Sequence, residues 1–197
     1  LIDDENAFAN ATTFVQTHFK TKDSSSLLYH ALILFQDILR FHLQDKNTDA
    51  LIDADIARIN FVYSNTIIAK KDILFESALQ KMEHVYAANP MIADAMFARA
   101  NLYFKQGKEY NPVTKKEFQF KLKEADALCQ ETIAKYPGST GAQNCYNLEI
   151  TLHTPSLGLV TENVNVSNWP FRTLVEYKNL STIYLRIIKT SYPELND

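Results

Sequence analysis

The chain has 197 residues, of which 46% are hydrophobic and 22% are charged, and its net charge is -3. This length and composition provide a core for one or two domains, while the charge leaves no basic surface for nucleic acid. No apolar run approaches the roughly 20 residues that a membrane span requires. The sequence therefore indicates a globular protein whose partners are not nucleic acids.

The first half of the chain is predicted to be helical. No proline occurs before Pro90 and no glycine before Gly107, so turn-forming residues are scarce there. Polar stretches separate four runs with helical spacing of apolar residues, and Leu28, Leu32 and Leu39 mark one face of the second run. The helices expected from these runs are 4–20, 25–44, 49–64 and 71–88.

Further along, local signals mark where helices begin. Asn89 followed by Pro90 is typical of an N-cap and the first helical position, and Ser139 is a cap candidate after Pro137. Thr114–Glu117 fits a capping box, in which each side chain accepts a hydrogen bond from the other residue's backbone. The helices expected from these signals are 91–106, 115–135 and 140–153.

Two stretches of the chain share one spacing. Ala78, Met82, Val85 and Pro90 are spaced like Ala125, Cys129, Thr132 and Pro137. This resembles the tetratricopeptide repeat, in which small residues let paired helices approach closely. The two prolines lie 47 residues apart instead of about 34, because a polar insertion, KEYNPVTKKEF, separates the repeats. We therefore expect a mainly α protein with a tetratricopeptide-like array at 1–155; an irregular helical bundle is the alternative.

After Pro155 the hydrophobic period changes from that of a helix to that of a strand. FRTLVEYK at 171–178 and STIYLRIIK at 181–189 alternate and are rich in β-branched and aromatic residues, and KNLS between them suits a hairpin connection. SLGLVTENVNV, which starts at Ser156, is a third candidate strand. The segment 156–197 is therefore predicted to be a short antiparallel β domain that is cut short.

The region from Pro137 to Lys189 resembles one junction in large α2-macroglobulin-like proteins of Bacteroides-type bacteria. With the tyrosine that precedes it, this region reads YPGSTGAQNCYNLEITLHTPSLGLVTENVNVSNWPFRTLVEYKNLSTIYLRIIK. FHLQDKNTDALIDADIARINFVY upstream is similar more loosely. In that family a helical region passes into the first macroglobulin domain, an antiparallel β-sandwich. The resemblance implies that 156–197 holds the first strands of such a domain.

The same resemblance implies a function. These family proteins trap proteases when a bait segment is cleaved, and they reside in the periplasm or cell envelope. The resemblance thus implies a non-catalytic scaffold or docking module of a protease inhibitor, with target proteases or envelope proteins as partners and a membrane anchor in a missing N-terminal segment. Cys129 and Cys145 lack the Cys-Gly-Glu-Gln context of the family's thioester. A free-standing tetratricopeptide-like adaptor that binds a protein or peptide in the envelope is the alternative.

No catalytic, cofactor or metal site is predicted, and no small-molecule substrate is inferred. The five histidines lack the spacing of metal ligands, so structural or surface roles are expected of them. Asp53 and Asp55 are two residues apart on a helix, point to different faces and are expected to be solvated. Pairing Cys129 with His153 as nucleophile and base finds no orienting third residue. A helical enzyme with an undetected site is the weakest hypothesis.

The two cysteines are nevertheless expected to lie close together in one helix interface. Cys129 and Cys145 lie eight residues on either side of Pro137, so an antiparallel hairpin centred there sets them at one height. Neighbouring helix axes run about 8–10 Å apart and a disulfide needs Cα atoms within about 7 Å, which makes the bond geometrically tight. The prediction is a shared interhelical seam that holds two buried thiols or a disulfide.

One cluster of aromatic residues surrounds the polar insertion. Core packing is one interpretation, and an aromatic groove for an extended peptide is the other. The candidate groove residues are Phe97, Tyr103, Phe104 and Tyr110.

Overall fold

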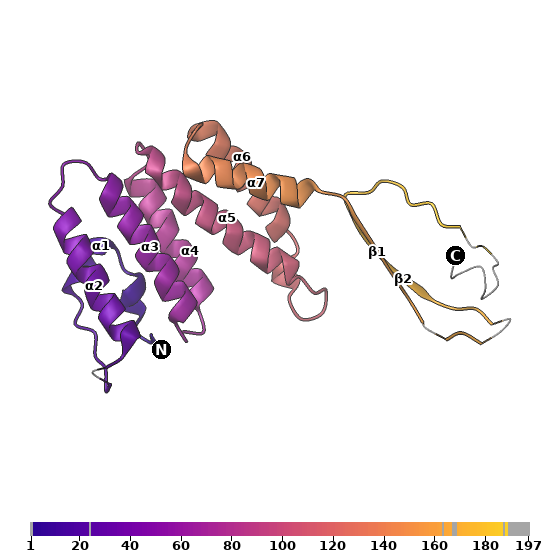
Figure 1. Ribbon diagram of the computed structural model, residues 1–197, viewed down its shortest axis with the longest axis horizontal. Helices are drawn as coiled ribbons and strands as arrows, with labels where there is room; N and C mark the ends of the chain where they lie inside the picture. Colours follow the sequence, from indigo (N-terminus) through magenta and orange to yellow (C-terminus); the bar gives the residue numbers. More distant parts are fainter. Residues whose placement is uncertain (1, 24, 163, 167–168, 187, 189–197) are drawn as a thin grey trace, which may run out of the picture. The chain divides into compact units, whose positions relative to one another are not determined.

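The computed structural model describes residues 2–23, 25–162, 164–166, 169–186 and 188, and these residues are mainly helical with a short antiparallel sheet near the C-terminal end (Figure 1). By its contacts the chain divides into two units, Leu1–Leu152 and His153–Asp197. The predicted fold class, mainly α followed by a short β segment, is confirmed.

Helices follow one another through the first unit, with longer connections between α1 and α2 and between α5 and α6 than between the other helices (Figure 1). None of the helices in the described ranges is long and apolar enough to cross a membrane. The elements are η1 (Glu5–Phe8), α1 (Ala11–Gln16), α2 (Leu27–His42), α3 (Asp49–Asn65), α4 (Lys71–Val85), η2 (Pro90–Ile92), α5 (Ala93–Lys108), η3 (Lys116–Phe118), α6 (Lys121–Lys135) and α7 (Thr140–His153).

The repeated small residues lie in the surfaces where these helices meet. Ala78 and Ala125, which are equivalent in the two stretches, are both buried, while Val85 is exposed. A Cβ atom on Gly107 of α5 would lie 2.6 Å from Cγ of Leu122 on α6. Such contacts are closer than a larger side chain permits, so the small residues set the spacing of the helical hairpin array.

The segment predicted as one helix at 4–20 is instead two short elements, η1 and α1. Ala9 and Asn10 between them are extended, and the Asn10 side chain accepts a hydrogen bond from the Thr13 backbone at 2.9 Å. An asparagine with this geometry starts a new helix instead of continuing the previous one. The prediction of a continuous helix is therefore wrong because Asn10 is a cap.

The helix predicted at 115–135 begins only at Lys121. The Asn111 side chain accepts hydrogen bonds from the backbones of Val113 and Thr114, which holds this stretch in a turn. Lys116–Phe118 then forms the 3-10 helix η3. The predicted capping box is not formed, because the Asn111 turn already engages the Thr114 backbone.

Two strands form the sheet of the second unit. β1 (Ser156–Thr161) pairs antiparallel with β2 (Thr173–Lys178), and Leu157 lies opposite Tyr177. The candidate strand that starts at Ser156 forms β1, whereas the strand predicted at 181–189 is not present at 181–186 or 188, and 187 and 189 lie outside the described residues. β2 therefore pairs with β1 and does not form the expected hairpin with 181–189 through KNLS. Alternation of apolar and polar residues indicates a strand, but it does not determine which other strand pairs with it.

The β1–β2 pair sorts its side chains by face. The register places Leu157, Leu159, Val175 and Tyr177 on one face, since residues at alternate positions share a side. Leu157, Leu159 and Tyr177 are each about half exposed or more. Within the described residues, this apolar face is not covered.

Candidate functional site

A hollow of about 180 Å³ lies between α3 and α5. On α5, Phe97, Asn101 and Lys105 follow at intervals of four residues, which places them along one face of the helix. On α3, Asn60 and Ser64 form the corresponding stripe. Two helices of successive hairpins thus present a polar rim to the same space.

Aromatic rings form the apolar part of this hollow. The rings of Tyr63 on α3 and Phe75 on α4 lie with centroids 4.3 Å apart, and Phe75 is buried. The Tyr63 hydroxyl donates to Asp72 Oδ1 at 2.9 Å, and Lys71 Nζ lies 4.9 Å from the Tyr63 ring centroid. Burial, together with the hydrogen bond to Asp72, raises the pKa of Tyr63.

The polar groups of the rim differ in how they are engaged. Asn60 Nδ2 donates to the Ile56 carbonyl at 3.0 Å, and Ser64 Oγ donates to the Asn60 carbonyl at 2.9 Å. The side chains of Asn101 and Lys105 make no hydrogen bond or ion pair with the residues that the structure describes. Asn101 and Lys105 are therefore available to a ligand.

Of the four aromatics predicted to form a groove, Phe97 lines this hollow. Tyr103 is buried against α4, where its hydroxyl donates to the Glu76 carboxylate and accepts from Arg99 Nη1. Six residues separate Tyr103 from Phe97, which turns the two side chains about a third of a turn apart. Phe104 is half-buried with Lys108 Nζ 5.5 Å from its ring centroid, and Tyr110 is exposed.

The two cysteines meet in the interior. Cys129 on α6 and Cys145 on α7 are both free thiols, both fully buried, and they share a hydrogen bond. The hydrogen bond with Cys145 and burial raise the pKa of the Cys129 thiol. The two buried thiols thus face each other across the α6–α7 seam.

The described residues contain no group of three or more His, Cys, Asp or Glu side chains placed to hold a metal ion.

The acidic pair of α3, Asp53 and Asp55, differs from the prediction in its burial. Asp53 is exposed, whereas Asp55 is 3% exposed. The two carboxylates do point to different faces, but the prediction that both are solvated is wrong, because Asp55 turns to a buried cation.

That cation is Arg58, which sequence reasoning missed. Arg58 is fully buried, and its guanidinium contacts Asp55 Oδ1 at 2.7 Å. It also donates to the carbonyls of Ala7 and Ala9 and lies 4.4 Å from the Phe14 ring centroid. The signal was the i, i+3 spacing of an acidic and a basic residue within an apolar helix face.

This ion pair joins the N-terminal segment to α3. Burial lowers the pKa of Arg58 and raises that of Asp55, and the opposite charge of each partner acts against these changes. Gln36 on α2 holds the same segment from the other side, because its Nε2 donates to the carbonyls of Phe14 and Thr17. Buried polar side chains thus bind the main chain of residues 7–17, which is a structural role.

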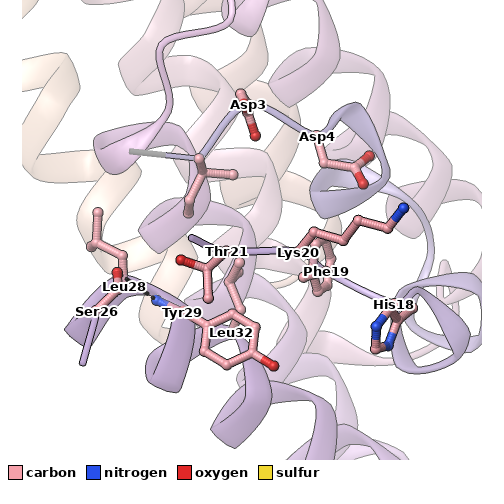
Figure 2. A pocket seen from close by; sticks show the side chains of 11 residues that line it. Asp3, Asp4, His18, Phe19, Lys20, Thr21, Ser26, Leu28, Tyr29 and Leu32 are labelled. Atoms are coloured by element: carbon pink, nitrogen blue, oxygen red, sulfur yellow. Dashed lines mark hydrogen bonds between the residues drawn. The ribbon is translucent and has the colours of Figure 1, made fainter. Parts of the chain in front are cut away.

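A second hollow, of about 380 Å³, lies where the N-terminal residues pass the start of α2. In Figure 2, Asp3 and Asp4 lie on one side of it and Tyr29 and Leu32 on the other. Lys20 also lines it, so charges of both signs are mixed at its rim. This mixture favours no single class of ligand, in contrast to the hollow between α3 and α5.

Comparison with known proteins identifies no relative: no protein-family model matches the chain, and no curated protein or solved structure matches it significantly.

Proposed function

We propose that this chain is a non-catalytic helical scaffold and docking module of a bacterial α2-macroglobulin-like protease inhibitor in the periplasm or cell envelope. The observation that carries the proposal is the sheet of β1 and β2, whose apolar face is uncovered within the described residues. An isolated pair of strands is marginal in water, and an exposed apolar face of this kind calls for a second layer. The first strands of a β-sandwich have this requirement.

The helical unit supports the scaffold part of the proposal. Its core is closed by small residues at helix contacts and by the buried Arg58–Asp55 pair, which is consistent with a structural role for this unit. The resemblance of residues 137–189 to the family's junction supplies the remaining argument. On this proposal the bait segment lies elsewhere in the full-length protein, and the present chain contributes structure and contacts.

The test measures protease activity on two substrates of different size. Full-length protein that traps a protease is expected to suppress cleavage of a large protein substrate while leaving cleavage of a small chromogenic peptide largely intact, since only the small substrate reaches the enclosed protease. The isolated 197-residue chain is expected to suppress neither. Full-length protein that suppresses neither cleavage, or an isolated chain that inhibits as well as the full-length protein, would contradict the proposal.

The hollow between α3 and α5 favours a second candidate, a tetratricopeptide-like adaptor that binds a protein or peptide in the envelope. The two candidates differ in whether the isolated chain binds a partner without the rest of the full-length protein. Pull-down from an envelope extract with the isolated chain and the full-length protein separates them, because an adaptor captures the same partner in both forms. A partner retained only by the full-length protein speaks against the adaptor.

A further inference from the structure

We propose that the outer face of α2 is a dimerisation surface, on which α2 of a second copy of this chain packs in antiparallel orientation. The inference does not depend on the protease-inhibitor proposal. It begins from the place of α2 in the first unit, where α1 and α2 lie at one end of the row of helices (Figure 1). Helix α2 packs mainly against α1 and α3.

Helix α2 has apolar residues on two faces. The inner face includes Leu32 and Leu39, which are buried. The outer face carries a stripe of five apolar positions, Leu27, Ala31, Leu34, Ile38 and Phe41. In this outer stripe Leu27 is 83% exposed, Leu34 is 60% exposed and Phe41 is 70% exposed. A surface helix needs one apolar face for its own core, so a second apolar face indicates a second partner.

The spacing within the outer stripe indicates the kind of partner. Its residues follow one another at alternating intervals of four and three positions, which gives a mean period of about 3.5, the period of a coiled-coil seam. Side chains at this period pack into the gaps between side chains of a second helix. Strands have a period of about 2 and do not match it. We therefore expect the partner to be another helix.

Self-complementarity favours α2 of a second copy as that helix. Leu27 and Phe41 lie seven positions on either side of Leu34, so the stripe has nearly the same layout when it is read from either end. A two-fold axis near Leu34 then sets the Leu27 end of one copy against the Phe41 end of the other, as an isologous dimer requires. The helix dipoles also favour this orientation, because the positive end of each α2 lies beside the negative end of the other.

The charges and the size of the surface are compatible with a dimer. Asp37 and Arg40 flank the outer stripe and pair with each other at 2.6 Å within one copy, so neither charge has to be buried alone. The stripe extends for about 21 Å along α2. Pairing two such faces removes on the order of 1,000 Å² of surface from water, which is the lower end for specific interfaces. We therefore expect a weak dimer with a dissociation constant in the micromolar range.

Analytical ultracentrifugation of the 197-residue chain tests for the dimer. The sedimentation coefficient is expected to rise with protein concentration from that of a monomer toward that of a dimer. Leu34→Asp is expected to raise the dissociation constant at least about tenfold, because the two-fold axis brings both introduced carboxylates into one apolar seam. Ile73→Asp is the matched control, because Ile73 is 68% exposed on α4, outside the stripe. Circular dichroism checks that both variants keep their helices.

A third variant tests the exposed face of β1 and β2 as the cause of association. Leu159→Asp places a charge on that face, where Leu159 is 52% exposed. A dimer formed through α2 is expected to persist in this variant and to be weakened by Leu34→Asp.

Thiol cross-linking tests the orientation of the two helices. Leu27→Cys and Phe41→Cys proteins are mixed and treated with a short bismaleimide reagent. Cross-links are expected between the two variants and not within either variant alone, because antiparallel packing brings position 27 of one copy near position 41 of the other. The native cysteines, Cys129 and Cys145, are fully buried, and the treated parent chain is the control for their reaction.

Four outcomes would overturn the inference. They are a chain that stays monomeric at millimolar concentration, equal weakening by Leu34→Asp and Ile73→Asp, a dimer that is lost in Leu159→Asp but kept in Leu34→Asp, and cross-links within Leu27→Cys alone that exceed those of the mixture. A chain that stays monomeric would assign the outer stripe to another part of the full-length protein, and preferred cross-linking within Leu27→Cys would show parallel helices.

Discussion

Arg58 is the residue on which the attachment of the N-terminal segment depends most. Its guanidinium is fully buried, and it contacts Asp55 together with two main-chain carbonyls. A buried charge is tolerated only when its partners replace water, since an arginine does not lose its proton in a protein. The pair therefore acts as one unit, and neither member can be changed alone at low cost.

Asp55→Asn is expected to lower the free energy of unfolding by roughly 3–5 kcal/mol, because it leaves the Arg58 charge buried without a counter-charge. Urea unfolding followed by circular dichroism measures the change. Asp53→Asn, at an exposed position two residues away, is the control and should change the free energy by no more than about 0.5 kcal/mol. Equal effects of the two substitutions would show that the ion pair contributes nothing specific.

Tyr63 makes stability fall at alkaline pH. Burial and the Asp72 hydrogen bond raise its pKa above the ordinary value of 10.0, so the unfolded chain loses this proton at a pH where the folded chain keeps it. The stabilisation is thus complete below about pH 10 and decreases as pH rises above it. Tyr63→Phe is expected to reduce the loss of stability between pH 9 and pH 11 in urea unfolding, whereas Tyr110→Phe, at an exposed residue, should leave the loss close to that of the parent.

At the scale of elements, Gly141 fixes how closely α7 approaches the start of α5. A Cβ atom there would lie 2.1 Å from the Ala93 carbonyl carbon, which belongs to the backbone and cannot turn aside. Gly141→Ala is expected to cost roughly 2–3 kcal/mol of unfolding free energy, more than the gain of at most about 1 kcal/mol in helix propensity.

Gly138→Ala is expected to destabilise the protein through backbone strain, whereas Gly141→Ala is expected to do so through a steric clash. No atom lies within 4 Å of its added Cβ, but its φ of +82° disfavours a side chain, so a cost of about 1 kcal/mol is expected. Thermal unfolding of the two variants should therefore rank Gly141→Ala as the more destabilised. The reverse order would mean that α7 moves away from α5 without penalty.

The burial of both cysteines between α6 and α7 determines how many thiols should react in the folded and in the denatured chain. Cys129 and Cys145 are free, buried and hydrogen bonded to each other, so titration with a thiol reagent should find two thiols in the denatured chain and almost none in the folded chain. Protein purified without reductant from an oxidising compartment tests the alternative. Two fewer thiols in the denatured protein, restored by reductant, would show that the seam closes as a disulfide.

Elements with local causes were predictable, and those with distant causes were not. Helices α2 to α5 and α7 lie within a few residues of the expected ranges, because apolar spacing and caps such as Asn89 and Ser139 are written in neighbouring residues. The strand expected at 181–189 is not formed at 181–186, because alternation within one segment does not decide which segments pair. Of the residues in the candidate site, Phe97 was predicted from the sequence. Asn101 and Lys105 could not be recognised as site residues without knowing that α3 packs beside α5.

For the whole molecule, the division into two units predicts that the helices fold without the sheet. Deleting residues 156–197 is expected to leave a soluble helical protein with the same unfolding midpoint, because the buried hydrophobic residues found in the described part of the chain belong to the first unit. The truncated protein should also associate less, since the exposed apolar face of β1 and β2 is removed. Loss of helical circular dichroism after truncation would show that both units unfold as one.

The attachment of the N-terminal segment to α3 has a consequence for the order of events during synthesis. Thr66 binds the Ile2 carbonyl from 64 positions further along the chain, and Arg58 reaches Ala7 from 51 positions further. Residues 2–19 therefore leave the ribosome well before the side chains that hold them exist. Until α3 emerges, Phe8 and Phe14 stay in water, so the nascent chain presents a short aromatic sequence to chaperones and hides it once Arg58 and Thr66 have left the ribosome.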